Sequence, residues 1–267
     1  MNIIRGLTHL VNRYKKGEES FKSISLRLIF WINKYRYDQV KVVEEQWNNL
    51  IVLDACRYDL FQEASTSLNG ELEGRYSLGT HTVEWMKNNF DTNIKDVVYV
   101  SGNPQVSSTK LKEWTGINNP FYHLENVWDS GWDEEQSTVP PEEVVEATKQ
   151  LKGEYPNKRF IVHFLQPHHP FIGKETLKTT NHQNGILNSM DWRPVFDNFS
   201  LDEIRDSFRK NLDLVLRQVE KLIEDLNGKT VITADHGEMF GEYGLYGHIP
   251  GMYTEELVKV PWLEVRE

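Results

Sequence analysis

Residues 230–242 read TVITADHGEMFGE, and this segment carries the strongest structural signal in the chain. It begins with the apolar run Thr230–Thr233, which is too short for a helix and is typical of a strand buried in a parallel sheet. Asp235 and His236 stand where that strand stops, and Gly237 allows a tight turn directly after them. Because a carboxylate beside an imidazole is a common ligand pair for divalent metals, the segment predicts a metal site at the end of a buried strand.

The same pattern occurs earlier, in LIVLDACRYD at Leu50–Asp59. The apolar run Leu50–Leu53 ends at Asp54. A carboxylate in that position is costly to desolvate unless a partner compensates, and a metal ion is one such partner. An aspartate after a strand can instead cap the next helix. Taken together with Asp235 and His236, Asp54 is predicted to be the third metal ligand.

Strands alternate with helices along most of the chain. Beyond the two strands above, short apolar runs and helical spacing of apolar residues mark the remaining elements. Strands are expected at Arg75–Leu78, Val97–Val100 and Phe160–Phe164, and helices at Tyr58–Ala64, from about Thr80, at Pro141–Leu151 and at Leu212–Leu226. This alternation predicts an α/β fold, a three-layer α/β/α sandwich with a mostly parallel central sheet. Residues 46–267 are expected to form one catalytic domain, preceded by an N-terminal helical extension at 1–45 with a helix at 20–37.

Composition narrows the functional class and the location. The net charge of −10 argues against a nucleic-acid-binding protein, although an anionic substrate remains compatible because a bound metal reverses the local field. Cys56 is the only cysteine, so no intramolecular disulfide is expected. The sequence shows no secretory signal and no run of roughly 18 apolar residues. A cytoplasmic location is therefore expected, with membrane-surface contact through the basic residues Arg13, Lys15 and Lys16 as an alternative.

A third segment, FIVHFLQPHHPF at Phe160–Phe171, places two histidines in a proline-bounded turn after a strand. At least one of His168 and His169 is expected to face the cleft, although either can be structural. Arg57 and Asn103 each follow a strand closely. They are candidate substrate contacts, with a salt bridge or a loop hydrogen bond as the alternative, and His169 is a third candidate.

A fourth segment, SLGTHTVEW at Ser77–Trp85, places threonines at the start of a predicted helix. Thr80 or Thr82 can cap that helix, with Glu84 in its first turn. Such a hydroxyl can instead be a nucleophile, activated by a metal and aided by the positive end of the helix.

Two long segments, residues 103–140 and 166–200, are expected to be loop-rich. Loops of this length inside an α/β domain are usually functional or insertional. The first contains aromatic residues that can stack on sugar rings or pack as a lid on the sheet: Trp114, Phe121, Tyr122, Trp128 and Trp132.

Taken together, these segments resemble the sulfatase-like branch of the alkaline phosphatase superfamily, from about Asn48 to Val265. The most specific part is D-H-G-E-M-F-G-E, followed by Gly247-His248 and by Val260-Pro261-Trp262. The resemblance implies three metal ligands, a substrate-contacting histidine in the P-H-x-P turn, and a basic residue that meets the substrate or leaving group. The matching residues are Asp54, Asp235 and His236 for the metal, His168 for the turn and His248 for the basic residue.

The sequence departs from sulfatases at the nucleophile. Sulfatases carry C-x-P-S-R, whose cysteine becomes formylglycine, whereas Thr80–Glu84 occupies that place here. Cys56 has no P-S-R after it and does not fill the role. The segment looks more like lipoteichoic-acid synthases, in which a threonine attacks phosphorus and a glutamate follows four residues later, as Glu84 follows Thr80. This resemblance implies phosphate rather than sulfate chemistry.

The resulting expectation is a metal-dependent phosphodiesterase or phospho-group transferase acting on a small-molecule or glycan phosphoester, such as a glycerol-phosphate cell-surface precursor. One divalent metal (Mn, Zn or Ca) is expected, because no Asp-x-x-x-His motif for a second is found. Thr80 would attack phosphorus, with Thr82 as the alternative, and His168 and His248 would stabilise charge or protonate the leaving group. The alternatives are a sulfuric ester hydrolase and a non-catalytic protein that binds a glycan or partner.

Overall fold

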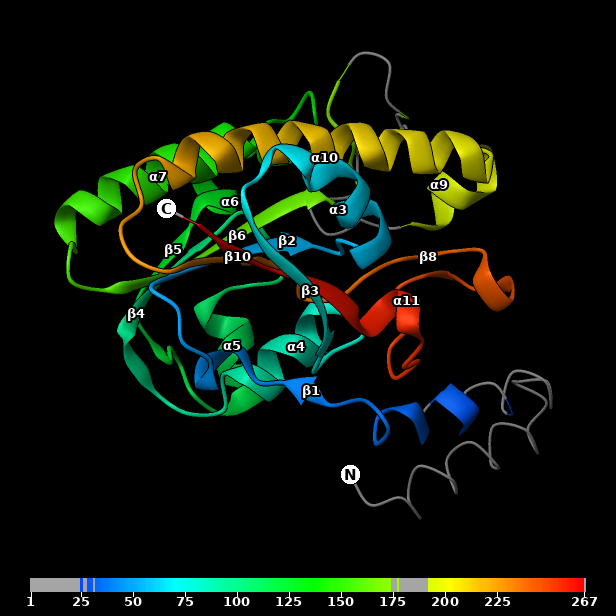
Figure 1. Cartoon of the computed structure of the whole chain (residues 1–267), viewed down its shortest axis with the longest axis horizontal. Helices are drawn as coiled ribbons and strands as arrows, with labels where there is room; N and C mark the ends of the chain where they lie inside the picture. The colour runs from blue at the N-terminus through cyan, green and yellow to red at the C-terminus, as the bar shows by residue number, and fades with distance from the viewer. Residues whose placement is uncertain (1–24, 26–27, 31, 174–176, 178–191, 267) are drawn as a thin grey trace.

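The computed structural model describes residues 25, 28–30, 32–173, 177 and 192–266 (Figure 1). The strands are β1 (Gln39–Val40), β2 (Asn49–Asp54), β3 (Gly70–Ser77), β4 (Ile94–Ser101), β5 (Phe121–Asn126), β6 (Arg159–Pro167), β7 (Thr230–Thr233), β8 (Met239–Phe240), β9 (Tyr246–Gly247) and β10 (Lys259–Val265). The α-helices are α3 (Tyr58–Ala64), α4 (Thr82–Asn89), α5 (Ser108–Thr115), α6 (Val127–Ser130), α7 (Pro141–Glu154), α9 (Arg193–Asn198), α10 (Leu201–Ile223) and α11 (Glu255–Val258). Short 3-10 turns lie at Val42–Glu44, Ser65–Ser67 and Glu242–Gly244.

Eight of these strands form one sheet in the order β1-β3-β10-β7-β2-β6-β4-β5. The pairs within β7-β2-β6-β4-β5 are parallel, as is β1 with β3. Among the described strands of this sheet, only β10 runs antiparallel to its neighbours, which are β3 and β7; β8 and β9 form a separate antiparallel pair. The prediction of a mostly parallel central sheet is confirmed.

Helices cover both faces of the sheet, which gives the expected three layers. Helices α3, α7 and α10 lie on one face and α4 and α5 on the other (Figure 1). A core cluster beneath α7 and α10 includes Phe164 and Leu216, and a second cluster on the opposite face includes Trp85 and Ile161. Side chains of a strand alternate between the faces, so the continuous apolar runs of β2 and β6 supply both clusters.

The long helix α10 forms for identifiable reasons. Ser200 and Glu203 make a reciprocal capping box that satisfies two donors at its start. Its buried stripe includes Leu212, Val215 and Val219, at the helical spacing seen in the sequence. The helix predicted at 212–226 is confirmed as part of α10, which starts earlier, at Leu201, and ends at Ile223.

The expected loop at residues 103–140 is partly wrong, because it contains α5, the edge strand β5 and the short helix α6. Among the described strands, β5 pairs only with β4, so most of its side chains stay partly exposed and its sequence FYHLEN lacks a continuous apolar run. An edge strand therefore gives a weaker hydrophobic signal than a central one.

The first described residues join the domain directly. Residues 25–33 are helical where they are described, and the rest of the predicted helix at 20–37 lies largely outside the described residues. Strand β1 pairs with the end of β3, so the sheet begins within the predicted extension of residues 1–45. None of the helices in the described ranges has the length and apolar character needed to cross a membrane.

Candidate metal and phosphoryl-transfer site

The three predicted metal ligands meet at the carboxyl ends of two neighbouring strands. Asp54 ends β2, and Asp235 and His236 follow β7, which pairs in parallel with β2. Nε2 of His236 lies 3.4 Å from Oδ1 of Asp54 and 3.4 Å from Oδ2 of Asp235. One ligand atom from each residue lies within 4.8 Å of the others, and all three side chains are buried.

The electrostatics of this triad require a positive charge. Burial and the charge of Asp235 raise the pKa of Asp54 to about 7. Burial disfavours charged His236, but Asp235 and Asp54 outweigh it and raise the pKa of His236 to about 10. Oδ1 of Asp54 has no hydrogen-bond partner among the described residues beyond the approach of His236. Two carboxylates and an imidazole with an orphaned oxygen fit a divalent metal such as Zn or Mn.

The two candidate nucleophiles lie in different surroundings. Thr82 donates from Oγ1 to Oδ2 of Asp235 over 2.7 Å, and Oγ1 lies 3.4 Å from Nε2 of His236. Thr80 instead donates from Oγ1 to Glu84 over 3.0 Å and accepts from the backbone N–H of Gly251 over 3.0 Å. The hydroxyl of Thr82 therefore belongs to the ligand cluster, whereas that of Thr80 is engaged outside it.

The start of α4 differs from the sequence expectation. Thr82 is the first residue of the helix, and the N-cap is His81, which makes no side-chain capping bond. Neither threonine caps the helix, because the hydroxyl of Thr82 is turned to Asp235 and the backbone N–H of Thr80 is bound by Glu84. This leaves the first turn of α4 beside the triad.

Of the predicted substrate contacts, Asn103 lies in the cluster and Arg57 does not. Asn103 donates from Nδ2 to Oδ2 of Asp54 over 2.6 Å, so it orients a predicted metal ligand. Arg57 is buried and binds Asp59 over 2.7 Å, Glu242 over 2.6 Å and the carbonyl of Glu238 over 3.2 Å. For Arg57 the structure shows the salt-bridge alternative. Its bonds to Glu238 and Glu242 hold the segment that follows His236 in place.

The predicted catalytic histidines form a second cluster beside the triad. Nδ1 of His248 lies 2.9 Å from Oε2 of Glu238, and the ring of His248 lies 4.7 Å from the ring of His236 between centroids. His168, His248 and Glu238 also form a group whose ligand atoms lie within 4.8 Å of one another. The sequence predicts one metal ion, and the structure shows a second group of residues whose geometry also suits a metal ion.

The environment of His168 and His169 is aromatic. Nε2 of His168 accepts from Nε1 of Trp192 over 3.1 Å, and burial lowers the pKa of His168 well below its usual value. His168 is therefore neutral. Its ring stacks on the ring of His169, with 4.8 Å between the ring centroids. His169 also packs edge-on against Trp192 at 4.4 Å and is buried.

Two residues of this region were missed by sequence reasoning. Glu238 was quoted in the D-H-G-E motif, but no role was assigned to it. His163 interrupts the apolar run FIVHFL of β6. Its Nε2 atom lies 3.9 Å from Oδ2 of Asp235. A polar residue inside an otherwise apolar strand was the available signal.

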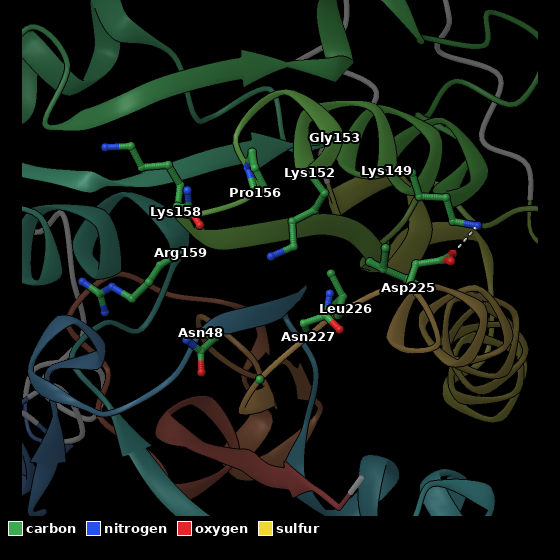
Figure 2. A pocket seen from close by; sticks show the side chains of 13 residues that line it. Asn48, Lys149, Lys152, Gly153, Pro156, Lys158, Arg159, Asp225, Leu226 and Asn227 are labelled. Atoms are coloured by element: carbon green, nitrogen blue, oxygen red, sulfur yellow. Dashed lines mark ion pairs between the residues drawn. The ribbon is translucent and has the colours of Figure 1, made fainter.

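A hollow of about 650 Å³ lies away from this chemistry (Figure 2). It is lined at the amino ends of β2, β6 and β7, opposite the triad, by residues that include Asn48, Lys152 and Arg159. Several of its cations already have partners, since Lys149 pairs with Asp225 over 2.8 Å and Arg159 with a neighbouring aspartate. This hollow is therefore separate from the candidate active site.

Comparison with solved structures identifies the fold. The soluble domain of lipooligosaccharide phosphoethanolamine transferase A from Neisseria meningitidis aligns with a TM-score of 0.56 at 14% identity, over 81% of this chain and 75% of that one. The C-terminal periplasmic domain of EcEptC from Escherichia coli, in complex with Zn, gives 0.50 at 12% identity, over 86% and 76%. A putative sulfatase from Bacteroides thetaiotaomicron gives 0.52 at 13% identity, over 83% and 64%. The chain also spans 48% of the integral membrane protein form of the Neisseria transferase.

No protein-family model and no curated protein sequence matches the chain. The structural likeness nevertheless shows that the chain has the fold of the sulfatase-like branch of the alkaline phosphatase superfamily. The cytoplasmic location expected from the sequence is contradicted. The E. coli neighbour is a periplasmic domain, and the Neisseria neighbour is the soluble domain of an integral membrane protein.

Proposed function

We propose that this chain is an extracytoplasmic, metal-dependent phospho-group transferase or phosphodiesterase that uses Thr82 as its nucleophile. The observation that carries the proposal is the hydrogen bond from the Thr82 hydroxyl to Asp235, inside the buried triad of Asp54, Asp235 and His236. The neighbouring phosphoethanolamine transferases support phosphate chemistry and an extracytoplasmic location.

Asp54, Asp235 and His236 would hold the metal ion. When bound, a divalent metal lowers the pKa of a nearby hydroxyl and neutralises charge on a phosphoryl oxygen. Asn103 keeps Asp54 turned toward the cluster through its 2.6 Å hydrogen bond. Asp235 accepts the hydrogen bond of Thr82 and so aims its Oγ1.

The reaction then divides into two steps. Oγ1 of Thr82 attacks phosphorus, its proton passes to Asp235, and the bond from phosphorus to the leaving oxygen breaks. His248, oriented by Glu238, gives its proton to the leaving alkoxide. An alcohol or water then gives its proton to His248 and attacks phosphorus, and the bond from phosphorus to Oγ1 of Thr82 breaks. Asp235 returns the proton to Oγ1, which restores the Thr82 hydroxyl and gives a transferred or a hydrolysed product.

The proposed substrate is a phosphodiester of a glycan, of glycerol or of an alkanolamine. Sulfuric ester hydrolysis is a second candidate, because the putative sulfatase shares the fold. It is disfavoured because the nucleophile segment holds Thr80-His81-Thr82 and has no C-x-P-S-R motif.

The test is hydrolysis of bis(p-nitrophenyl) phosphate, p-nitrophenyl phosphate and p-nitrophenyl sulfate with Mn, Zn, Ca or Mg. The native protein is compared with Thr82→Ala and Thr80→Ala. Metal-dependent diester cleavage that is lost in Thr82→Ala and kept in Thr80→Ala is expected. Cleavage of the sulfate ester alone would favour the second candidate, and cleavage indifferent to Thr82 would refute the proposed nucleophile.

A further inference from the structure

His163 occupies a position on β6 where an apolar residue would be expected. Side chains alternate along a strand, so His163 points to the same face as Ile161, which belongs to the cluster beneath α4. The imidazole is fully buried and lies edge-on to the ring of Trp85, with 5.9 Å between centroids. Polar groups in such surroundings are retained only when their hydrogen-bonding groups are used.

Only one nitrogen of His163 has a hydrogen-bond partner. Nδ1 lies 2.8 Å from the hydroxyl of Tyr99, which comes from the neighbouring strand β4. Nε2 has no hydrogen-bond partner among the described residues and lies 3.9 Å from Oδ2 of Asp235. The unpartnered atom is therefore aimed at a predicted metal ligand.

The tautomer of His163 follows from its two neighbours. The imidazole lies between the hydroxyl of Tyr99 at Nδ1 and the carboxylate of Asp235 at Nε2. A lone pair on Nε2 facing the Asp235 carboxylate would be repelled, whereas an N–H there is attracted. Burial keeps Tyr99 protonated by raising its pKa, so its hydroxyl donates to Nδ1 and leaves the proton on Nε2.

Asp235 needs a second contact that keeps its orientation during the proposed reaction. In the resting arrangement Oδ2 accepts a hydrogen bond from the Thr82 hydroxyl over 2.7 Å. That hydrogen bond is lost once the proton has passed to Asp235 and Oγ1 of Thr82 has attacked phosphorus. The Nε2–H of His163 does not take part in the bond changes and stays in place behind Asp235.

We propose that Tyr99 and His163 are positioning residues that hold Asp235 in its ligand orientation, with Tyr99 fixing the imidazole tautomer and Nε2–H directed at Oδ2. The inference rests on the proposed metal site. Groups behind a metal ligand typically contribute about 10- to 100-fold to metal affinity. Neither Tyr99 nor His163 contacts the substrate in this assignment.

The experiment measures metal affinity by calorimetric titration of the full chain with Zn²⁺ and Mn²⁺, so it does not depend on turnover. The variants are His163→Phe, which removes the donor, His163→Gln, which keeps an N–H, and Tyr99→Phe, which removes only the hydroxyl. His123→Phe is the matched control, because His123 binds Glu125 on the edge strand β5. Thermal unfolding of the metal-free proteins accompanies each titration.

We expect affinity to fall about 10- to 100-fold in His163→Phe, less in Tyr99→Phe, and little in His163→Gln or the control. Metal-free His163→Phe should be less stable than the native protein, because it leaves the buried hydroxyl of Tyr99 without its acceptor at Nδ1. Heteronuclear NMR of labelled imidazoles should show a proton on Nε2 of His163 in the native protein, and a mixture of tautomers in Tyr99→Phe.

Native affinity in His163→Phe, or equal loss in the glutamine and phenylalanine variants, would overturn the inference. If His163→Phe does not fold, native affinity and an unchanged tautomer in Tyr99→Phe would overturn it. If the proposed function is wrong, the experiment gives a different result from the ones that overturn this inference. A protein that binds no metal in its native form refutes the site itself, and one that binds metal without Thr82-dependent turnover refutes only the reaction.

Discussion

The hydroxyl of Thr82 donates to Oδ2 of Asp235 over 2.7 Å, and it is the first side chain of α4. Asp235 follows β7 and lies 153 residues after Thr82 in the sequence. Their contact places a candidate nucleophile from a helix start against a predicted metal ligand from a strand end. Thr80, two residues earlier, is bound to Glu84 instead.

We expect a covalent phosphothreonine on Thr82. Trypsin releases residues 76–87 between Arg75 and Lys87, a peptide that contains both threonines. After rapid acid quench of a turnover reaction, mass spectrometry should find the adduct in the native protein and in Thr80→Ala, but not in Thr82→Ala. Turnover of Thr82→Ala should fall by roughly 10³-fold or more, as for other covalent nucleophiles. An adduct that disappears only with Thr80→Ala would reverse the assignment.

The metal-free protein should lose stability as pH rises from about 4 to about 7. The pKa of Asp54 is raised to about 7 in the folded state by burial and by Asp235, from 3.8 in its ordinary state. The folded state therefore binds more protons than the unfolded state in that window, so the free energy of unfolding decreases as pH increases. Urea unfolding in EDTA at pH 5 and pH 7 measures the difference.

Asp54→Asn serves as the control for that pH effect. It removes the titrating carboxylate, so the decrease between pH 5 and pH 7 should become smaller. The same variant should no longer be stabilised by added Zn²⁺, whereas metal at about 100 times its dissociation constant should stabilise the native protein by about 2.7 kcal/mol. An undiminished pH slope in Asp54→Asn would contradict the assignment to this carboxyl.

Replacing Glu238 by Gln should impair turnover without destabilising the protein. The carboxylate of Glu238 holds Nδ1 of His248 at 2.9 Å, and its Oε1 has no hydrogen-bond partner among the described residues. The amide keeps the shape but loses the negative charge that holds the imidazole of His248 in place. Turnover should fall by roughly 10²-fold, the lower end for a general acid. Glu125→Gln is the matched control, because Glu125 pairs with His123 over 3.0 Å away from the site.

Arg57 should matter for stability far more than Arg205, although both bind Oε1 of Glu242. The side chain of Arg57 is 8% exposed and that of Arg205 is 48% exposed. Arg57→Met removes the buried donor of the Glu238 carbonyl and leaves Oε1 of Glu242 with the exposed Arg205 only among the described side chains, and should cost about 2–3 kcal/mol in unfolding free energy. Arg205→Met should cost less than about 1 kcal/mol. Equal losses in chemical denaturation would contradict a bracing role for Arg57.

The central strands were predictable because burial on both faces leaves a continuous apolar run. Asn49–Asp54 and Arg159–Pro167 contain such runs, and their neighbours in the sheet follow from the alternation with helices. The edge strand Phe121–Asn126 was not predicted, because a single neighbour allows polar side chains. The final strand Lys259–Val265 was quoted as a motif, but its place between β3 and β7 depends on pairing over long sequence separations.

The residues of the candidate site were predictable where a metal-ligating residue type stands at the end of a predicted strand. Asp54, Asp235 and His236 satisfy both conditions, and the structure brings them together. Arg57 also follows a strand, yet its guanidinium is drawn away by Glu242, which no local pattern reveals. The choice between Thr80 and Thr82 depends on where α4 begins. A sequence does not fix the first residue of a helix to better than about one or two positions.

Strand β10 has a consequence for the order in which the site is completed during synthesis. It lies between β7, which leads to Asp235, and β3, which leads to Thr82, and it is the last described strand of the chain. A ribosome produces Thr82 and Asp54 long before Asp235, and the sheet cannot join β3 to β7 until residues 259–265 have emerged. The nascent chain can therefore pair β2 with β7 and bring the predicted ligands together while Thr82 still lies apart, and insertion of this last strand joins the hydroxyl to them.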